Sequence, residues 1–287
     1  MKRAKHGFTL IEVAIFLAVT GLLFISVTVG VQNSIFQQRY TDSVQNFADF
    51  LRNLYSEIAN VQSRGSGNSE KAIYGKLVTF GETMNLGGGS NDETSNDNAS
   101  SQNIFVYDVI GGVGNFSGSG DAFRSLKALG ANVVIKEGDT YVPVGIIESY
   151  KTRWAAAIQA VEPHIPDLPE YFEGTILIVR HPSSGQVYTA ILKDNAGKNI
   201  VIEVNRMIDE MQKSGKEESV FGEDYLWDNS ENKSHFKIDE INFCVNPNGN
   251  EPSRIRANVR IDKGTSNASG VEVIMDGERN KCNGEGS

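Results

Sequence analysis

The chain has 287 residues, of which 36 are Asp or Glu and 27 are Lys or Arg, and its net charge is −9 at pH 7. This acidic balance argues against direct binding to nucleic acid, which needs clustered Lys and Arg to neutralise phosphates. The hydrophobic content of 39% is ordinary for a folded protein, so most of the chain is expected to be globular.

A long apolar segment lies near the N-terminus. Lys2, Arg3 and Lys5 precede Gly7, and residues 8–31 contain one charge, Glu12. At about 1.5 Å per residue, this segment can cross a membrane as a helix. Because the basic residues come first, the short leading end is expected in the cytoplasm and the larger C-terminal part outside the cytoplasmic membrane. This segment does not fit an ordinary secretory signal, whose apolar core is shorter and ends at a small-residue cleavage site.

Glu12 is the unusual residue of this segment. A carboxylate near the centre of a membrane span costs a few kcal/mol. Its presence therefore indicates a functional role and a group nearby that compensates its charge. Cleavage between Gly7 and Phe8 would create an α-ammonium about one helical turn away. That ammonium would compensate the carboxylate, either within one subunit or between neighbours in a packed array.

Residues 7–12 read GFTLIE, with basic residues before them and an unbroken apolar run after them. This pattern resembles the leader of type IV pilins and of the pseudopilins of type II secretion and DNA-uptake machines. The resemblance implies cleavage after Gly7 by prepilin peptidase and N-methylation of Phe8. It also implies assembly with other pilin or pseudopilin subunits at a membrane platform, where Glu12 pairs with the Phe8 amino terminus of a neighbour.

The helical pattern continues beyond the apolar segment. Apolar residues recur every three or four positions, at Phe36, Tyr40, Val44, Phe47, Leu51, Leu54, Ile58 and Val61. This is the spacing of one stripe on an α-helix. We therefore predict a helix from about Phe8 to Gln62, apolar all round over 8–31 and amphipathic over 32–63. A coiled-coil stalk would need longer heptads with complementary flanking charges.

Residues 64–287 are predicted to form an α+β head packed on the long helix. Strands are expected at 72–80, 104–110, 133–136, 141–147, 176–180, 187–192 and 199–204, and helices at 122–129, 149–162 and 206–213. The segments 236–244, 253–261 and 270–275 alternate with period 2 and predict an antiparallel meander. The fold is therefore pilin-like, with an antiparallel sheet enlarged by an insertion or second subdomain at about 111–233.

Two polar segments of the head raise binding hypotheses. Asp92, Glu93 and Asp97 supply oxygens that suit calcium, but their spacing is not that of an EF-hand. Some pseudopilins bind calcium in a head loop, so the resemblance keeps calcium as an alternative to a head with no metal and no cofactor. The glycine-rich residues 111–120 lack the G-K-[ST] of a P-loop and are interpreted as a flexible turn.

The cysteines, Cys244 and Cys282, both lie in the part expected to be exported. An even number in an oxidising compartment predicts one disulfide, which would contribute roughly 4 kcal/mol in the chain-entropy model. No histidine lies near either cysteine in the sequence, so a zinc site is not expected. Pilin-like proteins often carry a C-terminal disulfide loop, and the resemblance implies the same pairing.

The sequence contains no recognisable catalytic motif. His164, His181 and His235 are scattered, and neither G-x-S-x-G nor H-E-x-x-H occurs. We therefore expect a structural subunit and no enzyme, and the large, loop-rich head favours a minor or tip component of a filament. The alternative is a membrane-anchored extracytoplasmic binding or adhesion protein that uses the helix only as an anchor. Such a protein would tolerate Glu12→Leu.

Overall fold

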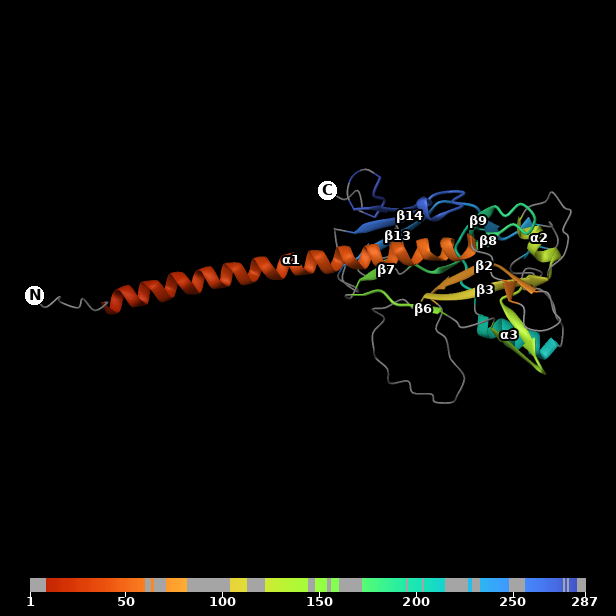
Figure 1. The fold of residues 1–287 in the computed structure, drawn as a ribbon, viewed down its shortest axis with the longest axis horizontal. Helices are drawn as coiled ribbons and strands as arrows, with labels where there is room; N and C mark the ends of the chain where they lie inside the picture. The colour runs from red at the N-terminus through yellow and green to blue at the C-terminus, as the bar shows by residue number, and fades with distance from the viewer. Residues whose placement is uncertain are drawn as a thin grey trace, which may run out of the picture. The chain divides into compact units, whose positions relative to one another are not determined.

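In a computed structural model, the chain has two compact units, Met1–Asp42 and Ser43–Ser287, and helix α1 (Leu10–Ala59) contributes to both (Figure 1). The structure describes residues 9–59, 63–64, 71–81, 104–112, 122–143, 148–153, 156–159, 172–194, 196–202, 204–214, 227–228, 233–247, 256–275, 277 and 279–282.

The described part of the first unit is helical from Leu10 onward and carries an apolar surface. Its large apolar side chains, from Leu10 to Phe36, are between 42% and 89% exposed. Each of three hydroxyl side chains donates to a carbonyl one turn earlier: Thr20 to Phe16, Ser26 to Leu22 and Thr28 to Phe24, at 2.6–2.9 Å. These bonds satisfy the hydroxyl groups within the helix, so the helix can present an apolar face to its surroundings.

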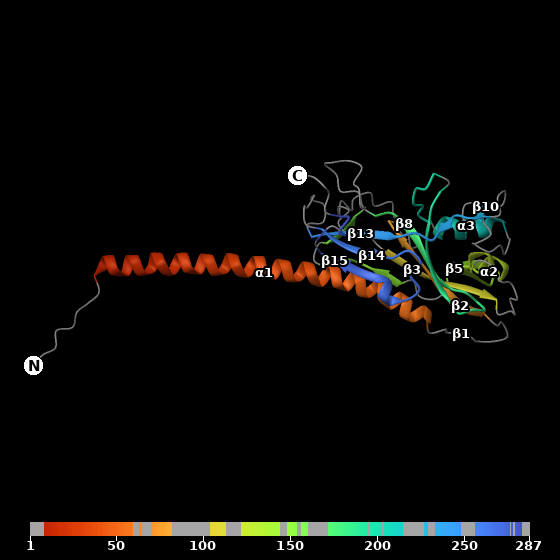
Figure 2. The same ribbon diagram turned by 90° about the horizontal axis from the view of Figure 1, so that it is seen from above.

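From Ser43 onward, α1 belongs to the second unit and packs on its sheets. One stripe of this part is buried, comprising Val44, Phe47, Ala48, Leu51, Leu54, Tyr55 and Ile58. The stripe follows the three- and four-residue steps of the sequence, so the amphipathic helix is confirmed from Val44 to Ile58. Phe36, which the predicted stripe included, is 50% exposed, and Val61 lies outside the described residues. Figure 2 shows this part of α1 running beside the strands of the head.

The larger sheet of the second unit, sheet A, is antiparallel throughout. Its order is β12-β9-β8-β2-β3-β6, with β1 paired to β2. The bounds are β1 (Ser63–Arg64), β2 (Lys71–Phe80), β3 (Ile104–Gly112), β6 (Glu148–Tyr150), β8 (Gly174–Arg180), β9 (Val187–Leu192) and β12 (Phe236–Lys237).

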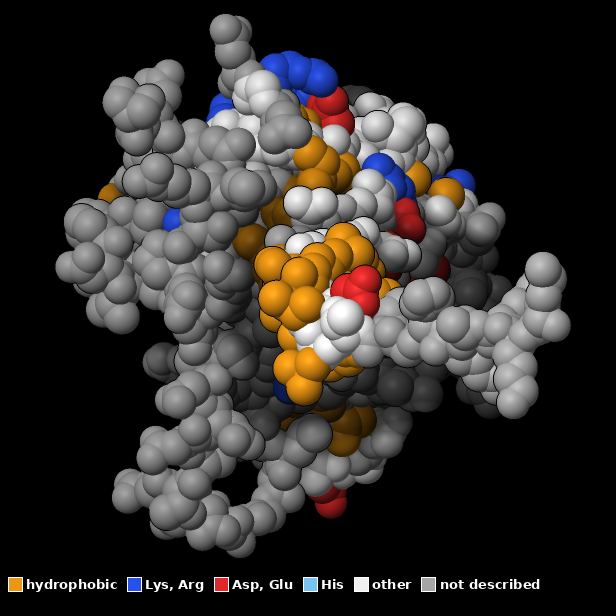
Figure 3. Space-filling model, turned by 90° about the vertical axis from the view of Figure 1, so that its left-hand side faces the viewer, with side chains coloured by type: hydrophobic (Ala, Val, Ile, Leu, Met, Phe, Trp, Pro, Cys, Tyr) orange, Lys and Arg blue, Asp and Glu red, His pale blue; other side chains and the backbone are white. Residues whose placement is uncertain are grey.

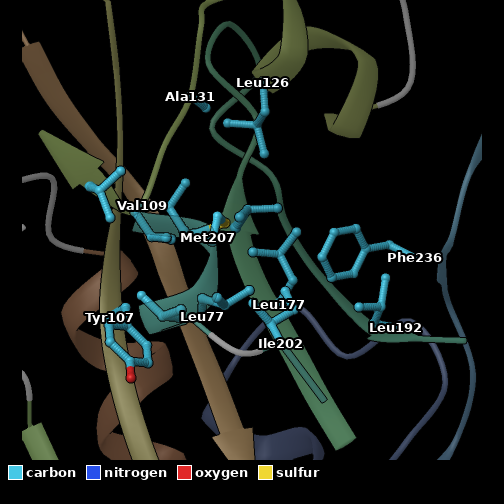
Figure 4. Close-up of a cluster of buried hydrophobic side chains, with 14 of the residues drawn as sticks. Leu77, Tyr107, Val109, Leu126, Ala131, Leu177, Leu192, Ile202, Met207 and Phe236 are labelled. Atoms are coloured by element: carbon cyan, nitrogen blue, oxygen red, sulfur yellow. The ribbon is translucent and has the colours of Figure 1, made fainter. Parts of the chain in front are cut away.

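Both faces of sheet A are covered. One face contacts α1, and the other packs against α2 (Ala122–Ala128) and α3 (Val204–Ser214) in a cluster that includes Leu77, Leu177 and Met207 (Figure 4). Side chains alternate between the faces of a strand, so Lys76 of β2 points to the α1 side while its neighbour Leu77 points to the other. Burial on both faces explains why β8 is buried continuously from Gly174 to Val179.

The smaller sheet, sheet C, is the predicted C-terminal meander with one added strand, but its first strand begins at Ile241, because residues 236–237 of the segment expected at 236–244 pair with β9 in sheet A. Its order is β15-β14-β13-β7, all antiparallel. The strands are β7 (Ala157–Gln159), β13 (Ile241–Asn246), β14 (Ala257–Ile261) and β15 (Val271–Ile274), with a 3₁₀ turn, η2 (Ala268–Gly270), before β15. Phe243 of β13 meets Phe47 of α1 edge to face at 5.3 Å between ring centroids, so α1 packs on sheet C as well.

Two short hairpins complete the described strands, β4 (Val134–Glu137) with β5 (Thr140–Pro143) and β10 (Trp227–Asp228) with β11 (Lys233–Ser234). The first corresponds to the strands expected at 133–136 and 141–147. The division of the head into a core and an inserted part at 111–233 stays a prediction. Strands β8 and β9 from that range are hydrogen-bonded within the same sheet as β2.

Two sequence-based expectations were wrong. The helix expected at 149–162 is replaced by β6 and β7, because Ser149 pairs with β3 and Ile158 pairs with β13. Cross-strand pairing overrode a helix-forming composition there. The strand expected at 199–204 is reduced to a single bridge between Asn199 and Lys193, and Val204 already begins α3.

Candidate functional site

The first described turn of α1 is closed by a reciprocal cap. The Val13 N–H donates to the Thr9 carbonyl at 3.2 Å, which places Thr9 at the N-cap. The N–H and the hydroxyl of Thr9 both donate to Oε2 of Glu12 at 2.9 Å, and the Glu12 N–H donates back to the Thr9 hydroxyl at 3.3 Å. This is a capping box, in which two otherwise unpaired donors of the helix end are satisfied.

The cap gives Glu12 a partner inside its own subunit. Sequence reasoning looked for a partner only at the Phe8 amino group, although the pattern Thr-x-x-Glu before an apolar run is a known signal for a capping box. The N-terminal end of the helix dipole also favours a negative charge at this position. The carboxylate is therefore oriented by its own chain.

The surroundings of Glu12 are apolar and open. Leu10 is 89% exposed, Ile11 is 65% exposed and Phe16 is 69% exposed. Figure 3, which faces this end of α1, shows apolar side chains gathered around an acidic one. By length and composition α1 could cross a membrane, and the most apolar window of the helix has no buried residue. A single oriented carboxylate thus sits in a surface suited to lipid or to other apolar helices.

The remaining predicted site residues fall into two groups. Gly7 and Phe8, and likewise Asp92, Glu93 and Asp97 of the calcium hypothesis, lie outside the described residues. The disulfide between Cys244 and Cys282 is confirmed, and it joins β13 to the C-terminal segment.

The hydrogen bonds of His181 indicate a structural role in the turn between β8 and β9. Its Nδ1 accepts hydrogen bonds from the N–H groups of Ser183 and Ser184, and its Nε2 lies 3.3 Å from the hydroxyl of Ser125 on α2. An imidazole that accepts two backbone donors holds the β8–β9 turn. Within the described residues, no group of three or more His, Cys, Asp or Glu side chains is arranged to hold a metal ion.

A largely buried lysine, Lys76, fastens the last turns of α1 to sheet A through three carboxylates, of which Glu57 and Glu148 are about half exposed. The Lys76 ammonium lies 3.0 Å from Glu57 of α1, 2.9 Å from Asp108 of β3 and 3.6 Å from Glu148 of β6. Burial alone would lower the pKa of Lys76, but hydrogen bonds to Asp108 and Glu57 and the nearby carboxylate charges outweigh it and raise this pKa. The lysine therefore stays charged and ties three elements together.

A chain of buried hydroxyl groups ties α1 to both sheets. The Tyr55 hydroxyl lies 2.7 Å from the Thr189 hydroxyl of β9, which donates to the Thr265 carbonyl at 2.9 Å. Since Thr189 has one hydroxyl proton, Tyr55 is the donor in the first bond. Burial raises the pKa of Tyr55, although the bond to Thr189 opposes this. At the end of α1, Arg180 donates to the Ala59 carbonyl at 3.2 Å and caps the helix.

Comparison with known proteins identifies the N-terminal segment. Residues 2–28 match the family model of the prokaryotic N-terminal methylation motif. Neither the curated proteins nor the solved structures contain a match to the chain. The matched range holds the basic residues, Gly7, Phe8, the capped Glu12 and the first part of the exposed apolar helix.

Proposed function

We propose that the chain, whose N-terminal motif is of the type IV pilin or pseudopilin type, is a structural subunit of a pilus or pseudopilus. In this proposal it is cleaved after Gly7, N-methylated at Phe8 and polymerised through the apolar part of α1. Its partners are prepilin peptidase, the assembly platform in the membrane and other pilin or pseudopilin subunits. It passes from the cytoplasmic membrane to a filament at the cell surface.

The observation that carries this proposal is a single carboxylate, Glu12, in the exposed apolar first part of α1, which bears the methylation motif. A membrane anchor gains nothing from Glu12, because a charge in hydrocarbon is unfavourable. A filament subunit does gain, because the carboxylate gives an entering subunit one polar contact that fixes its position among otherwise non-directional apolar contacts. The hydrogen bonds of the Thr9 cap lower the free-energy cost of holding the Glu12 carboxylate in the membrane before the subunit assembles.

The head supports a minor or tip role. Two helices, α2 and α3, cover the face of sheet A that α1 leaves open, so this head has three layers. Such a head is bulky for a subunit that must repeat closely along a filament. A component present in few copies is free of this steric restriction, because its head does not have to pack against identical heads along the filament.

The proposal is tested by assembly of a Glu12→Leu variant in the host. We expect the variant to accumulate in the membrane fraction and to be lost from the filament fraction sheared from cells. Val13→Leu, on the same turn of α1, is the matched control and should assemble like the wild type. Equal recovery of the Glu12→Leu variant in filaments would contradict the proposal and favour a membrane-anchored binding or adhesion protein.

A further inference from the structure

Residues 238–240 connect the two sheets of the head. They leave β12 of sheet A and enter β13 of sheet C. Within this linker Asp239 lies 2.6 Å from the Lys193 ammonium, and Glu240 lies 2.6 Å from the Lys281 ammonium. Two adjacent carboxylates of one short linker are thus each held by a different lysine.

The two lysines belong to different sheets. Lys193 directly follows β9, and its N–H donates to the His235 carbonyl beside β12, so it is fixed to sheet A. Lys281 precedes Cys282, whose disulfide fixes it to Cys244 of β13 in sheet C. Each sheet therefore holds one carboxylate of the linker between them.

The charged groups around the linker make both ion pairs sensitive to acid. The hydrogen bond from Lys193 lowers the pKa of Asp239, with further contributions from the Glu240 N–H and from the charge of Lys263. Hydrogen bonds from Asn242 and Lys281 lower the pKa of Glu240, and the charge of Arg260 adds to this effect. The stabilisation is therefore present above the unfolded-state pKa of about 4 and is lost as the pH falls through the lowered folded-state pKa.

Protonation would also leave an excess of positive charge at the linker. Asp239 would then no longer neutralise the charges of Lys193 and Lys263, and Glu240 would no longer neutralise the charge of Lys281. Arg260 is less affected, because Asp262 and Glu272 each hold it at 2.8 Å. The unneutralised charge at each carboxyl adds to the loss of the two pairs.

A second connection between the sheets does not titrate in this range. The hydroxyl of Thr189 in β9 donates to the carbonyl of Thr265 in the loop between β14 and β15. Both groups are buried and uncharged. Of these two connections between the sheets, the neutral one and the charged one, only the charged one responds to acid.

We propose that residues 238–240 form an acid-sensitive joint, closed while Asp239 holds Lys193 and Glu240 holds Lys281, and opened when both carboxylates are protonated. Opening loosens the attachment of β12 to β9 and of the C-terminal segment to β13. The exported head thereby gains a local response to acid that does not require the rest of the fold to unfold. This inference stands independently of cleavage and filament assembly.

The test is amide hydrogen exchange of the full chain in detergent micelles at pH 7 and at pH 3, with protection factors corrected for the intrinsic exchange rate at each pH. For the wild type we expect protection of residues 236–240 to fall by roughly three- to tenfold at pH 3, the range two exposed ion pairs can supply. In a Lys193→Gln/Lys281→Gln variant, protection should be low at pH 7 and change less than about twofold.

Thr189→Val is the matched control, because it breaks the neutral connection, together with the bond from Tyr55, and leaves both ion pairs in place. It should lower protection at both pH values and keep the wild-type ratio between them. Unchanged wild-type protection at pH 3, or a wild-type pH response in the double lysine variant, would overturn the proposal. An equal fall of protection throughout β2, β3 and β8 would also overturn it, since that result would mean global unfolding.

Discussion

The hydroxyl chain from Tyr55 through Thr189 to Thr265 offers a quantitative test of how α1 is held to the head. All three residues are at most 6% exposed. Thr189→Val keeps the side-chain shape but leaves the Tyr55 hydroxyl without an acceptor and the Thr265 carbonyl without a donor. Each unsatisfied buried group costs about 1–3 kcal/mol, so the two together should lower the free energy of unfolding by roughly 2–6 kcal/mol.

Tyr55→Phe should cost only about 1 kcal/mol, because Thr189 keeps its bond to the Thr265 carbonyl. In the Tyr55→Phe background, Thr189→Val no longer strands the tyrosine hydroxyl, so its cost should fall by about 1 kcal/mol or more. Urea unfolding of the full chain in detergent micelles, followed by near-ultraviolet circular dichroism, measures all four proteins. Thr41→Val, which removes an exposed hydroxyl on α1, is the control and should change stability by less than about 0.5 kcal/mol.

Strictly additive costs of the two substitutions would refute this reasoning. Additivity would mean that the hydroxyl groups of Tyr55 and Thr189 act independently and that the chain does not couple α1 to the sheets.

Three further predictions follow from single residues. Gly75→Ala should destabilise the head by about 1–3 kcal/mol in urea unfolding, because a Cβ there would collide with the backbone of Ile178, whereas Gly21→Ala meets open space and should be neutral or slightly stabilising. Cys282→Ser should lower the free energy of unfolding by roughly 4 kcal/mol, because it removes the constraint of the disulfide on the unfolded chain. Reductant removes the same constraint, so the reduced wild type should have the same thermal midpoint as the variant. The raised pKa of Lys76 means that its contribution is complete below the unfolded-state pKa of about 10.4 and is lost as the pH rises above it. A Lys76→Met variant should therefore lack that alkaline loss in an unfolding series from pH 8 upward.

Local patterns in the sequence were sufficient to predict much of the fold. The stripe from Val44 to Ile58 predicted the packing face of α1, since a helix of this composition has only one apolar side to bury. The alternation in 236–275 predicted the meander, and the even cysteine count predicted the disulfide. In each case, the information lies within one element or in a short segment.

The errors arose where distant residues decide the structure. Ala156 and Ala157 suggested a helix, but they are buried and Ala157 pairs with Asn246 of β13, a residue far away in sequence. Nothing local to residues 149–162 encodes that partner. The three-layer arrangement was missed for the same reason, because the apolar face of α3 does not indicate which face of which sheet it covers.

At the candidate site, the sequence singled out Glu12 but not its contacts. Glu12 stood out as the one charge in an apolar segment, and this is the basis of the assembly role proposed for it. The pattern Thr-x-x-Glu predicts the Thr9 cap. The sequence analysis considered only a charged partner for Glu12, at Phe8, and so missed the hydrogen-bonded partner three residues away.

The most direct test of the central claim is mass spectrometry of the intact protein and of its N-terminal peptide, recovered from the membrane of a host with active prepilin peptidase. We predict a chain that begins at Phe8 and carries one added methyl group. A chain that still begins at Met1 would contradict processing as a pilin-type subunit, and the head would then have to be assayed as an anchored binding protein.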